Sequence, residues 1–300
     1  MSELTNASDG SVPYPALRRT QAAPTAHEVD VLVIGAGTTG MYQLCRARGE
    51  GFSTSLLEAG QALDHAWHTD RPAAERLPSR PEVEHRLAQM VDQLGLSPHI
   101  RLGARVDSVV YDASSGAWVV TTTGSLTCRA RFVVVATGAL AAPPGDHPYS
   151  HALGRLGVRG REGLALAGYW ADGPRTYLGV MTAGFPNFFF PAGPHGTAGH
   201  CTLGAVDQVD FVTGTLVHAR ERGCEVVEVG LSAEEEWTNL MNGTSAPLFL
   251  NQHVFEAAPG EPGSGSPARC VRRHPEKPFA TPVDDDAYAG FVFSKAESAV

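Results

Sequence analysis

The stretch VDVLVIGAGTTG, residues 29–40, decides the expected fold of this chain. Its first half is a run of apolar and β-branched residues that ends at a glycine, which is typical of a buried parallel strand. Its second half has the spacing Gly35-x-Gly37-x-x-Gly40. In such a loop the first glycine permits a tight turn, the second lets the backbone approach a pyrophosphate, and the third lets the following helix pack closely. The stretch therefore predicts a dinucleotide-binding loop.

The residues after this loop complete a βαβ unit. A helix is expected over residues 38–51, and a second strand over residues 53–60. Glu58 lies at the carboxyl end of that second strand, where a carboxylate binds the ribose hydroxyls of FAD or NAD. The loop itself does not distinguish these two cofactors. The cofactor-binding residues predicted from this unit are Gly35, Ala36, Gly37, Thr38, Thr39, Gly40 and Glu58.

Further along the chain, apolar periodicity and turn residues predict more helices and strands. Two capping-box patterns, Ser79–Glu82 and Ser232–Glu235, indicate the starts of two helices. The other expected elements are a β-hairpin with strands at 105–112 and 117–122, strands at 128–138, 187–193 and 224–229, and a helix at 205–222.

Composition and charge narrow the class of protein. The 300 residues include 32 acidic and 23 basic side chains, for a net charge of −9, which argues against a nucleic-acid partner. No apolar run is long enough to span a bilayer, and the N-terminus does not read as a signal peptide. The five scattered cysteines predict free thiols in a reducing compartment. We therefore expect a cytoplasmic protein with no membrane partner.

A long motif in the second half of the chain carries a family resemblance. The segment LGRLGVRGREGLALAGYWADGPRTYLGVMTAGFPNFFFPAGP, residues 153–194, resembles the C-terminal FAD-domain signature of Baeyer–Villiger monooxygenases, which are class B flavoprotein monooxygenases. Shorter stretches resemble other parts of the same family, namely EAGQALDHAW, SRPEVEHRLAQMVDQLGL, ATGALAAP and YAGFVFS.

This resemblance implies a cofactor and a reaction. In the family, NADPH reduces FAD, the reduced flavin forms a peroxide with dioxygen, and the peroxide converts a ketone into an ester or lactone. The resemblance assigns the glycine loop and Glu58 to FAD. It also adds Trp67, Val106, Ala136, Thr137, Gly138, Gly193 and Pro194 to the cofactor site. His195, which follows the Gly-Pro turn, is a candidate for hydrogen bonding to flavin or substrate.

The chain also departs from the family pattern. Asp64-His65-Ala66 stand where the family has two glycines and a threonine before the tryptophan. A second GxGxxG loop, the FxGxxxHxxxW fingerprint and the active-site arginine are missing. The missing block lies between the family's two linkers, so the inserted NADPH domain is expected to be deleted, and no NADPH site is found.

The fold expected from these observations is a three-layer, Rossmann-like α/β FAD-binding domain with a small antiparallel β insertion. Residues 1–28 read as a flexible arm and residues 29–250 as the FAD domain. That domain would have a first part at 29–138, a junction at 139–152 and a second part at 153–250. Residues 251–300 read as a linker and a C-terminal tail.

Three functional hypotheses follow. The first is an FAD-dependent oxidoreductase that oxygenates a ketone or a similar small organic substrate, with NADPH use in doubt and a separate flavin reductase as a candidate partner. The second is a non-catalytic FAD-binding protein or partner subunit derived from the same family. The third is a remnant that binds no ligand.

Other side chains have structural explanations. Asp172 and Arg175 fit a structural ion pair as well as a catalytic acid and a cation clamp. The phenylalanines at 185 and 188–190 fit core packing. No metal site is predicted. His65 and His68 lack a paired second ligand motif, and a polar loop beside the flavin is favoured over a metal site for His195, His200 and Cys201.

Overall fold

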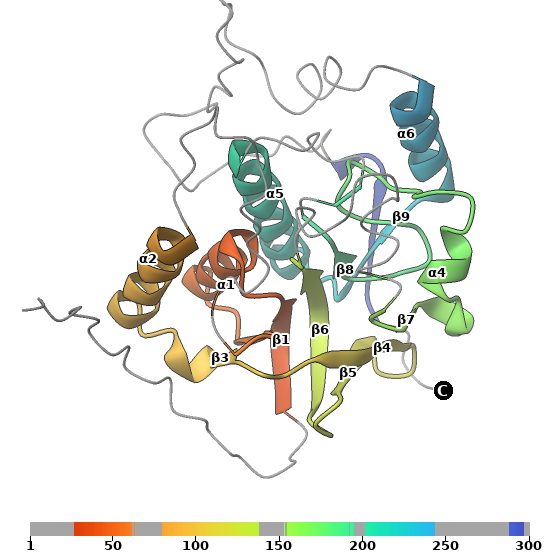
Figure 1. Ribbon diagram of the computed structural model, residues 1–300. Helices are drawn as coiled ribbons and strands as arrows, with labels where there is room; N and C mark the ends of the chain where they lie inside the picture. Colours follow the sequence, from red (N-terminus) through yellow and green to blue (C-terminus); the bar gives the residue numbers. More distant parts are fainter. Residues whose placement is uncertain are drawn as a thin grey trace, which may run out of the picture.

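A computed structural model of the chain describes residues 27–61, 63, 80–137, 153, 155–191, 193–194, 202–243 and 288–296. Within these residues a mainly parallel sheet lies at the centre, with helices packed against it (Figure 1). The strand order is β3-β2-β1-β6-β5-β4-β7, and β8 pairs with β6 off this path. These strands are β1 (His27–Ile34), β2 (Thr54–Leu57), β3 (Ile100–Arg101), β4 (Val106–Asp112), β5 (Ala117–Thr122), β6 (Thr127–Val135), β7 (Val158–Arg159) and β8 (Phe188–Phe189).

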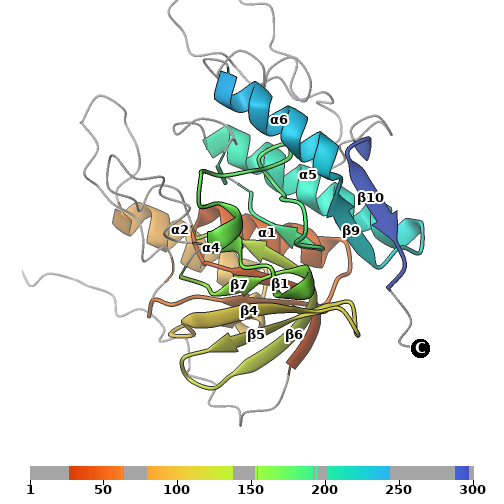
Figure 2. The same cartoon turned by 90° about the vertical axis from the view of Figure 1, so that its right-hand side faces the viewer.

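The two central strands bury both of their faces, because side chains alternate along a strand. On β1, Val31 and Val33 face the helices, while Leu32 and Ile34 face the opposite side. Figure 2 shows α1 (Thr38–Gly49) and α5 (Thr202–Glu221) on one side of β1 and the β4–β5 hairpin on the other. Two apolar cores, one on each face, account for the near-continuous apolar sequence of β1.

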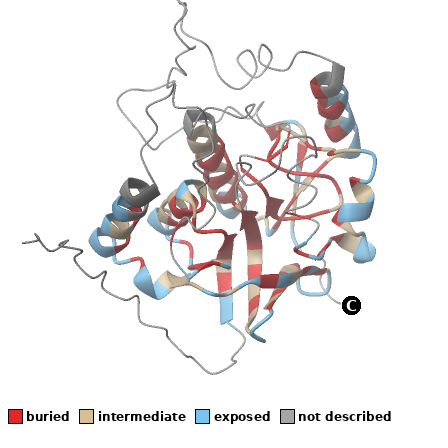
Figure 3. Cartoon of the chain, in the orientation of Figure 1, coloured by how far each residue is buried: buried red, intermediate tan, exposed pale blue. Residues whose placement is uncertain are grey.

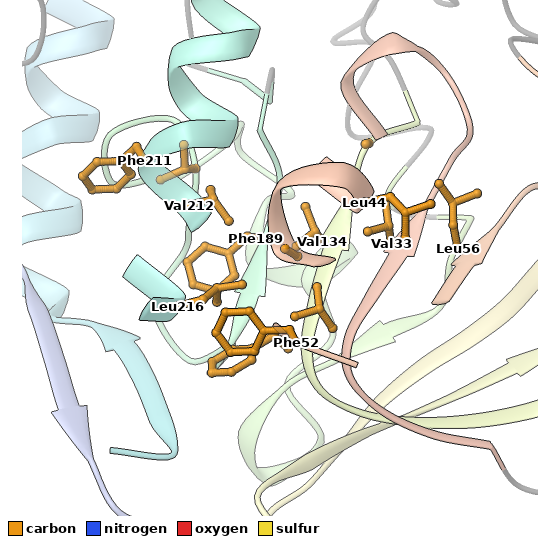
Figure 4. Close-up of a cluster of buried hydrophobic side chains, with 14 of the residues drawn as sticks. Val33, Leu44, Phe52, Leu56, Val134, Phe189, Phe211, Val212 and Leu216 are labelled. Atoms are coloured by element: carbon orange, nitrogen blue, oxygen red, sulfur yellow. The ribbon is translucent and has the colours of Figure 1, made fainter. Parts of the chain in front are cut away.

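The core on the helix side joins β1 and β6 to α1 and α5. Figure 4 shows Val33, Leu44, Val134, Phe189 and Leu216 converging between these elements. All five side chains are buried, and buried residues concentrate along the central strands and the facing sides of the helices (Figure 3). Removing this much apolar surface from water is the dominant stabilising contribution in a fold of this kind.

Helices α1 and α5 lie side by side through polar as well as apolar contacts. Asp210 accepts hydrogen bonds from Tyr42 Oη at 2.9 Å and from Arg46 Nε at 2.7 Å. Near the other end of α1, Arg220 Nη1 donates to the carbonyl of Glu50 at 2.7 Å. Because residue numbers rise together along both helices, the two helices run in the same direction. Both therefore begin at the same end of the sheet.

Strand β6 changes partner along its length. Its first half pairs antiparallel with β5, and Val133 and Val134 pair in parallel with Phe188 and Phe189 of β8. The predicted hairpin at 105–122 is confirmed, with residues 113–116 forming the turn between β4 and β5. The predicted strand at 187–193 is shorter than expected, and its phenylalanines are confirmed as core residues.

Two helices confirm predictions made from the sequence. The predicted βαβ unit is confirmed, and α1 ends where Gly51 adopts a φ of +84°. The predicted helix at 205–222 is also confirmed as α5, which ends before Gly223 with a φ of +64°. Helix α2 spans Arg80–Gln93, and the short helices are η1 (Ser97–His99), η3 (Arg161–Gly163) and α4 (Leu166–Tyr169).

The end of the chain corrects one expectation. Residues 251–300 read as a linker and tail, but β10 (Phe291–Ser294) pairs antiparallel with β9 (Val226–Val229). Tyr288 and Phe291 are buried in the helix-side core. The sequence carries no local sign of this pairing, because the two strands lie far apart in the chain.

The start of α6 (Leu231–Gly243) corrects another expectation. The sequence predicts Ser232 as the N-cap and Glu235 as its partner, but the helix begins at Leu231, two residues earlier than that cap implies. The amide of Glu234 donates to the carbonyl of Gly230 at 3.0 Å, so Gly230 takes the N-cap position. Ser232 lies inside the first turn and is exposed. The side chain that points into the protein is that of Glu234.

The fold class predicted from the sequence is confirmed, namely a mixed α/β structure with a mainly parallel central sheet. Among the described helices, none combines the length and apolarity that crossing a membrane requires.

The β4–β5 turn yields a pH prediction. Hydrogen bonds from Ser114 and Ser115, followed by one from Arg129, lower the pKa of Asp112 to about 2. A lowered pKa contributes stability above the unfolded-state value of about 3.9, and that stability is lost as pH falls toward about 2. Because Asp112 is partly exposed and screened by solvent, we expect Asp112→Asn to cost less than about 1 kcal/mol near neutral pH.

Urea unfolding of the parent chain and of Asp112→Asn tests this prediction. The difference in unfolding free energy should shrink as pH falls from about 5 to about 3. A difference that stays constant over this interval would show that the turn is stabilised by something other than the ionised Asp112.

Candidate functional site

Most of the predicted cofactor residues that the structure describes lie near one edge of the central sheet. Strands β1, β2, β6 and β8 run parallel, so their carboxyl ends lie at the same edge (Figure 1). The glycine loop follows β1, Glu58 follows β2, and Ala136 and Thr137 follow β6. Gly193 and Pro194 come shortly after β8. Open α/β sheets bind their ligands at this edge, which makes it the candidate site.

The first and third glycines of the loop are required by close backbone contacts. Gly35 has a φ of +108°, and a Cβ there would lie 2.5 Å from the carbonyl oxygen of Ala136. A Cβ on Gly40 would lie 1.9 Å from the carbonyl oxygen of Gly35. These contacts pack the loop and the first turn of α1 against the end of β6. The tight turn and the close helix packing predicted for these two glycines are therefore present.

Within the described residues, no side chain caps the N-terminus of α1. Gly37 occupies the N-cap position, so no side-chain oxygen caps the helix there, and the first turn has no acidic residue. The first intrahelical bond runs from the amide of Met41 to the carbonyl of Gly37 at 2.9 Å. The amides of Thr38, Thr39 and Gly40 precede that bond, so they face the loop side of the helix. Together with the helix dipole, they form a donor set suited to a phosphate group.

Glu58 is held in place by backbone amides. Its Oε2 accepts a hydrogen bond from the amide of Ala36 at 2.8 Å, and its Oε1 accepts one from the amide of Gly60 at 2.6 Å. The carboxylate thus bridges the glycine loop and the turn after β2. Each carboxylate oxygen can accept a second hydrogen bond. Glu58 therefore has the orientation and the remaining acceptor capacity to bind hydroxyl groups next to the loop.

Val106 follows a loop that is tied to the turn after β2. In this loop the amide of Gly103 donates to the carbonyl of Gly60 at 2.7 Å, and that of Ala104 donates to the carbonyl of Glu58 at 2.8 Å. Val106 itself is buried at the start of β4, beside a register shift in the β4–β5 pairing. The β insertion thus begins next to the predicted ribose-binding residue.

The Gly193–Pro194 turn packs closely against its own strand. Both residues are buried. A Cβ on Gly193 would lie 2.4 Å from the ring of Phe190 and 3.3 Å from the carbonyl oxygen of Gly179. Glycine is therefore required here by packing alone, whether or not a cofactor lies beside it. Three other predicted site residues, Trp67, Gly138 and His195, lie outside the described residues.

The signature segment has a structural role that the sequence did not reveal. Arg175 does not pair with Asp172, which is exposed; its Nε contacts Glu234 Oε2 at 3.2 Å. Glu234 is completely buried and also accepts hydrogen bonds from Tyr169, from Thr182 and from the amide of Ala183. A signal for this burial was available in the sequence, namely the i, i+3, i+4, i+7 spacing of one buried helix face in Glu234, Trp237, Thr238 and Met241.

Metal ligands do not cluster in the described part of the chain. No group of three or more His, Cys, Asp or Glu side chains there is arranged to hold a metal ion. Cys45, Cys128 and Cys224 are free thiols, and burial raises the pKa of the Cys128 thiol to about 12. The candidate ligands considered in the sequence lie outside the described ranges. They are His65, His68, His195, His200 and Cys201.

Comparison with known proteins identifies monooxygenases as relatives. The chain is 34% identical over 84 residues to cyclohexanone 1,2-monooxygenase of Acinetobacter sp., a match that covers 28% of this chain and 16% of that protein. It is 34% identical over 83 residues to a Baeyer–Villiger monooxygenase of Pseudooceanicola batsensis, covering 28% and 15% respectively. No protein-family model matches the chain.

Solved structures extend the similarity to the fold. The crystal structure of OTEMO in complex with FAD and NADP matches with a TM-score of 0.63 and 15% identity, over 72% of this chain and 90% of that chain. At this identity the likeness concerns the fold alone. The sequence matches cover about a sixth of the length of these two curated relatives. Together the comparisons confirm the resemblance to Baeyer–Villiger monooxygenases.

Proposed function

We propose that this chain binds FAD at the carboxyl edge of its sheet and oxygenates a ketone or a similar small organic substrate. The observation that carries the proposal is the Glu58 carboxylate, which is anchored to Ala36 and Gly60 beside the open N-terminus of α1. The relatives' names support the reaction class, since they are monooxygenases of cyclohexanone and of the Baeyer–Villiger type. The cytoplasmic location expected from the sequence is part of the proposal.

The donors and acceptors of the site fit the adenosine diphosphate half of FAD. The first-turn amides of α1 would donate hydrogen bonds to the pyrophosphate, and the helix dipole would favour its negative charge. Glu58 would accept hydrogen bonds from the ribose hydroxyls, which favours a cofactor without a 2′-phosphate. Val106 and the loop at 103–105 would border the adenosine on the other side of Glu58.

The roles of the remaining predicted residues follow from their places in the fold. Ala136 and Thr137 would border the cofactor at the end of β6, and Gly193 and Pro194 would pass beside the flavin. Bound FAD supplies redox and oxygen-activating chemistry that protein side chains lack. Trp67, Gly138 and His195 remain predicted members of the flavin site.

The source of electrons is part of the proposal. NADP is present in the OTEMO structure, but this sequence contains a single GxGxxG loop and no fingerprint for a second dinucleotide. We therefore propose that a separate flavin reductase or an external reductant serves this chain. The alternative is an FAD-binding protein without turnover. Adding dithionite, NADPH or a flavin reductase together with a ketone, and measuring ester formation, distinguishes the two.

Glu58 provides a direct test of the cofactor site. We expect the purified chain to show bound-flavin absorption after addition of FAD, and Glu58→Gln to weaken FAD binding about ten- to one hundred-fold, because the amide offers one acceptor in place of two. The measurement is titration of the apoprotein with FAD, followed by quenching of flavin fluorescence.

Glu221→Gln is the matched control, because Glu221 is an exposed acid at the end of α5. It should bind FAD as the parent chain does. If the parent chain takes up no flavin with FAD in excess, the proposed function is wrong. If Glu58→Gln binds as tightly as the parent, FAD binds elsewhere or without the ribose contact.

A further inference from the structure

One face of helix α6 contacts residues 169–183, which are the middle part of the signature segment at 153–194. Glu234 and Thr238 lie one helical turn apart, and both are buried. Thr238 Oγ1 accepts a hydrogen bond from the amide of Thr176 at 3.1 Å and donates to the carbonyl of Thr176 at 3.2 Å. Between them, the ring of Trp237 packs edge-on against Tyr177 at 6.3 Å between centroids. The helix is thus attached to this segment at several successive residues.

Glu234 makes the largest number of these attachments. Its Oε1 accepts hydrogen bonds from Thr182 Oγ1 and from the amide of Ala183, both at 2.7 Å. Its Oε2 accepts from Tyr169 Oη at 2.6 Å and from Arg175 Nε at 3.2 Å. Both oxygens therefore use their full acceptor capacity, which is what allows a carboxylate to be buried completely. The four donors come from the beginning, the middle and the end of residues 169–183.

Tyr169 remains a hydrogen-bond donor over the whole physiological pH range. Burial, followed by the hydrogen bond to Glu234, raises the pKa of Tyr169 to about 12. The Arg175 guanidinium also lies over the Tyr169 ring, 5.5 Å from its centroid. Charge, hydrogen bonds and ring packing thus all favour one arrangement of these three side chains.

Residues 178–183, which end at the two residues bound to Glu234 Oε1, lie next to the Gly193–Pro194 turn. Leu178 and Gly179 have φ values of +53° and +67°, and leucine in this conformation needs support from its surroundings. The amide of Phe190 donates to the carbonyl of Val180 at 2.9 Å. A Cβ on Gly193 would approach the carbonyl oxygen of Gly179 to 3.3 Å. A displacement of residues 178–183 would therefore displace Gly193 as well.

We propose that Glu234 is a positioning residue for the flavin site. It holds the signature segment in place, and the backbone of that segment at Gly179 and Val180 sets the position of the Gly193–Pro194 turn beside the flavin. The inference rests on the proposed function, because it assumes that Gly193 and Pro194 border FAD. Glu234 itself lies behind this turn and acts through it.

The test compares Glu234→Gln with Glu235→Gln, a matched change at the neighbouring exposed acid on the same helix. In Glu234→Gln, an amide NH₂ replaces one of the two acceptor oxygens and faces two of the four donors. We expect FAD to bind at least about ten-fold more weakly and the absorption band of bound flavin to change shape. Glu235→Gln should match the parent chain in both measurements.

A double variant separates positioning from loss of structure. In Glu234→Gln combined with Arg175→Gln, two amides replace the charged pair, and one can donate to the other. Recovery of most of the FAD affinity and of the parent absorption band supports the proposal. If Glu234→Gln does not fold, Tyr169→Phe removes one of the four donors and keeps the ring that Arg175 covers. A smaller effect in the same direction then supports the proposal.

The other outcomes overturn the inference. If the parent chain binds FAD and Glu234→Gln binds it equally well with an unchanged band, Glu234 does not position the flavin site, while the proposed function stands. An equal loss in Glu235→Gln would show a general effect of charge on α6. If the parent chain takes up no FAD, the proposed function fails, and this inference fails with it.

Discussion

Replacing Gly40 with alanine is expected to lower the free energy of unfolding by about 3 kcal/mol and to abolish FAD uptake. The added Cβ would lie 1.9 Å from the carbonyl oxygen of Gly35 and 3.3 Å from the Cβ of Ala136. Moving the loop backbone or the end of β6 would cost considerable free energy, because both are packed at the centre of the sheet. The first turn of α1 would have to move away from the loop, which would disperse the amides that we propose to bind the pyrophosphate.

Gly49→Ala is the matched control in the same helix. Gly49 has no atom within 4 Å of its added Cβ, so the substitution meets open space. Alanine there should leave FAD binding unchanged and raise stability by up to about 1 kcal/mol, since alanine favours helix more than glycine does. Urea unfolding of the apoproteins and FAD titration measure both effects. Equal behaviour of the two variants would contradict the close packing of Gly40.

Trp118→Ala is expected to cost about 3–5 kcal/mol in unfolding free energy, independently of any cofactor. The Trp118 side chain is completely buried, and its Nε1 donates to the carbonyl of Pro186 at 2.7 Å. Its ring lies 5.2 Å from those of Tyr111 and Phe188, measured between centroids. This side chain therefore joins the β insertion to the segment that leads toward Gly193.

Two further variants complete the Trp118 series. Trp118→Phe keeps part of the packing and leaves the Pro186 carbonyl without its donor, which should cost about 1–3 kcal/mol. Val110→Ala, at an exposed position of β4, should cost less than about 1 kcal/mol. Urea unfolding followed by circular dichroism ranks the three. If Trp118→Ala falls within about 1 kcal/mol of the parent, the hairpin is an appendage that contributes little to the domain.

The local elements could be read from the sequence because their causes are local. The apolar run of β1, the glycine spacing and Gly51 after α1 each act within a few residues, and the structure has all three where they were expected. Glu58 could also be placed, because a short βαβ unit brings the end of β2 beside the loop after β1. The hairpin followed from two β-branched runs separated by a short turn.

The elements that were missed depend on contacts between distant segments. Glu234 reads as part of a short acidic helix. Its spacing with Trp237, Thr238 and Met241 marks one face of that helix, but the contacts that bury Glu234 come from the distant residues Tyr169, Thr182 and Ala183. β10 is a short strand at the end of a chain segment that reads as a tail, and it is specified by its pairing with β9. Short strands have too little local preference to be assigned without their partners.

The sequence by itself thus determined the tight glycine loop after β1 and the place of Glu58 at the end of β2, since backbone sterics and helix capping act over a few residues. Only the tertiary structure decided that β6 joins the insertion to β8 and that Arg175 pairs with Glu234. It also decided that a strand near residue 291 completes the second, smaller sheet. These features arise from the burial and pairing of side chains far apart in the chain, which local preference does not encode.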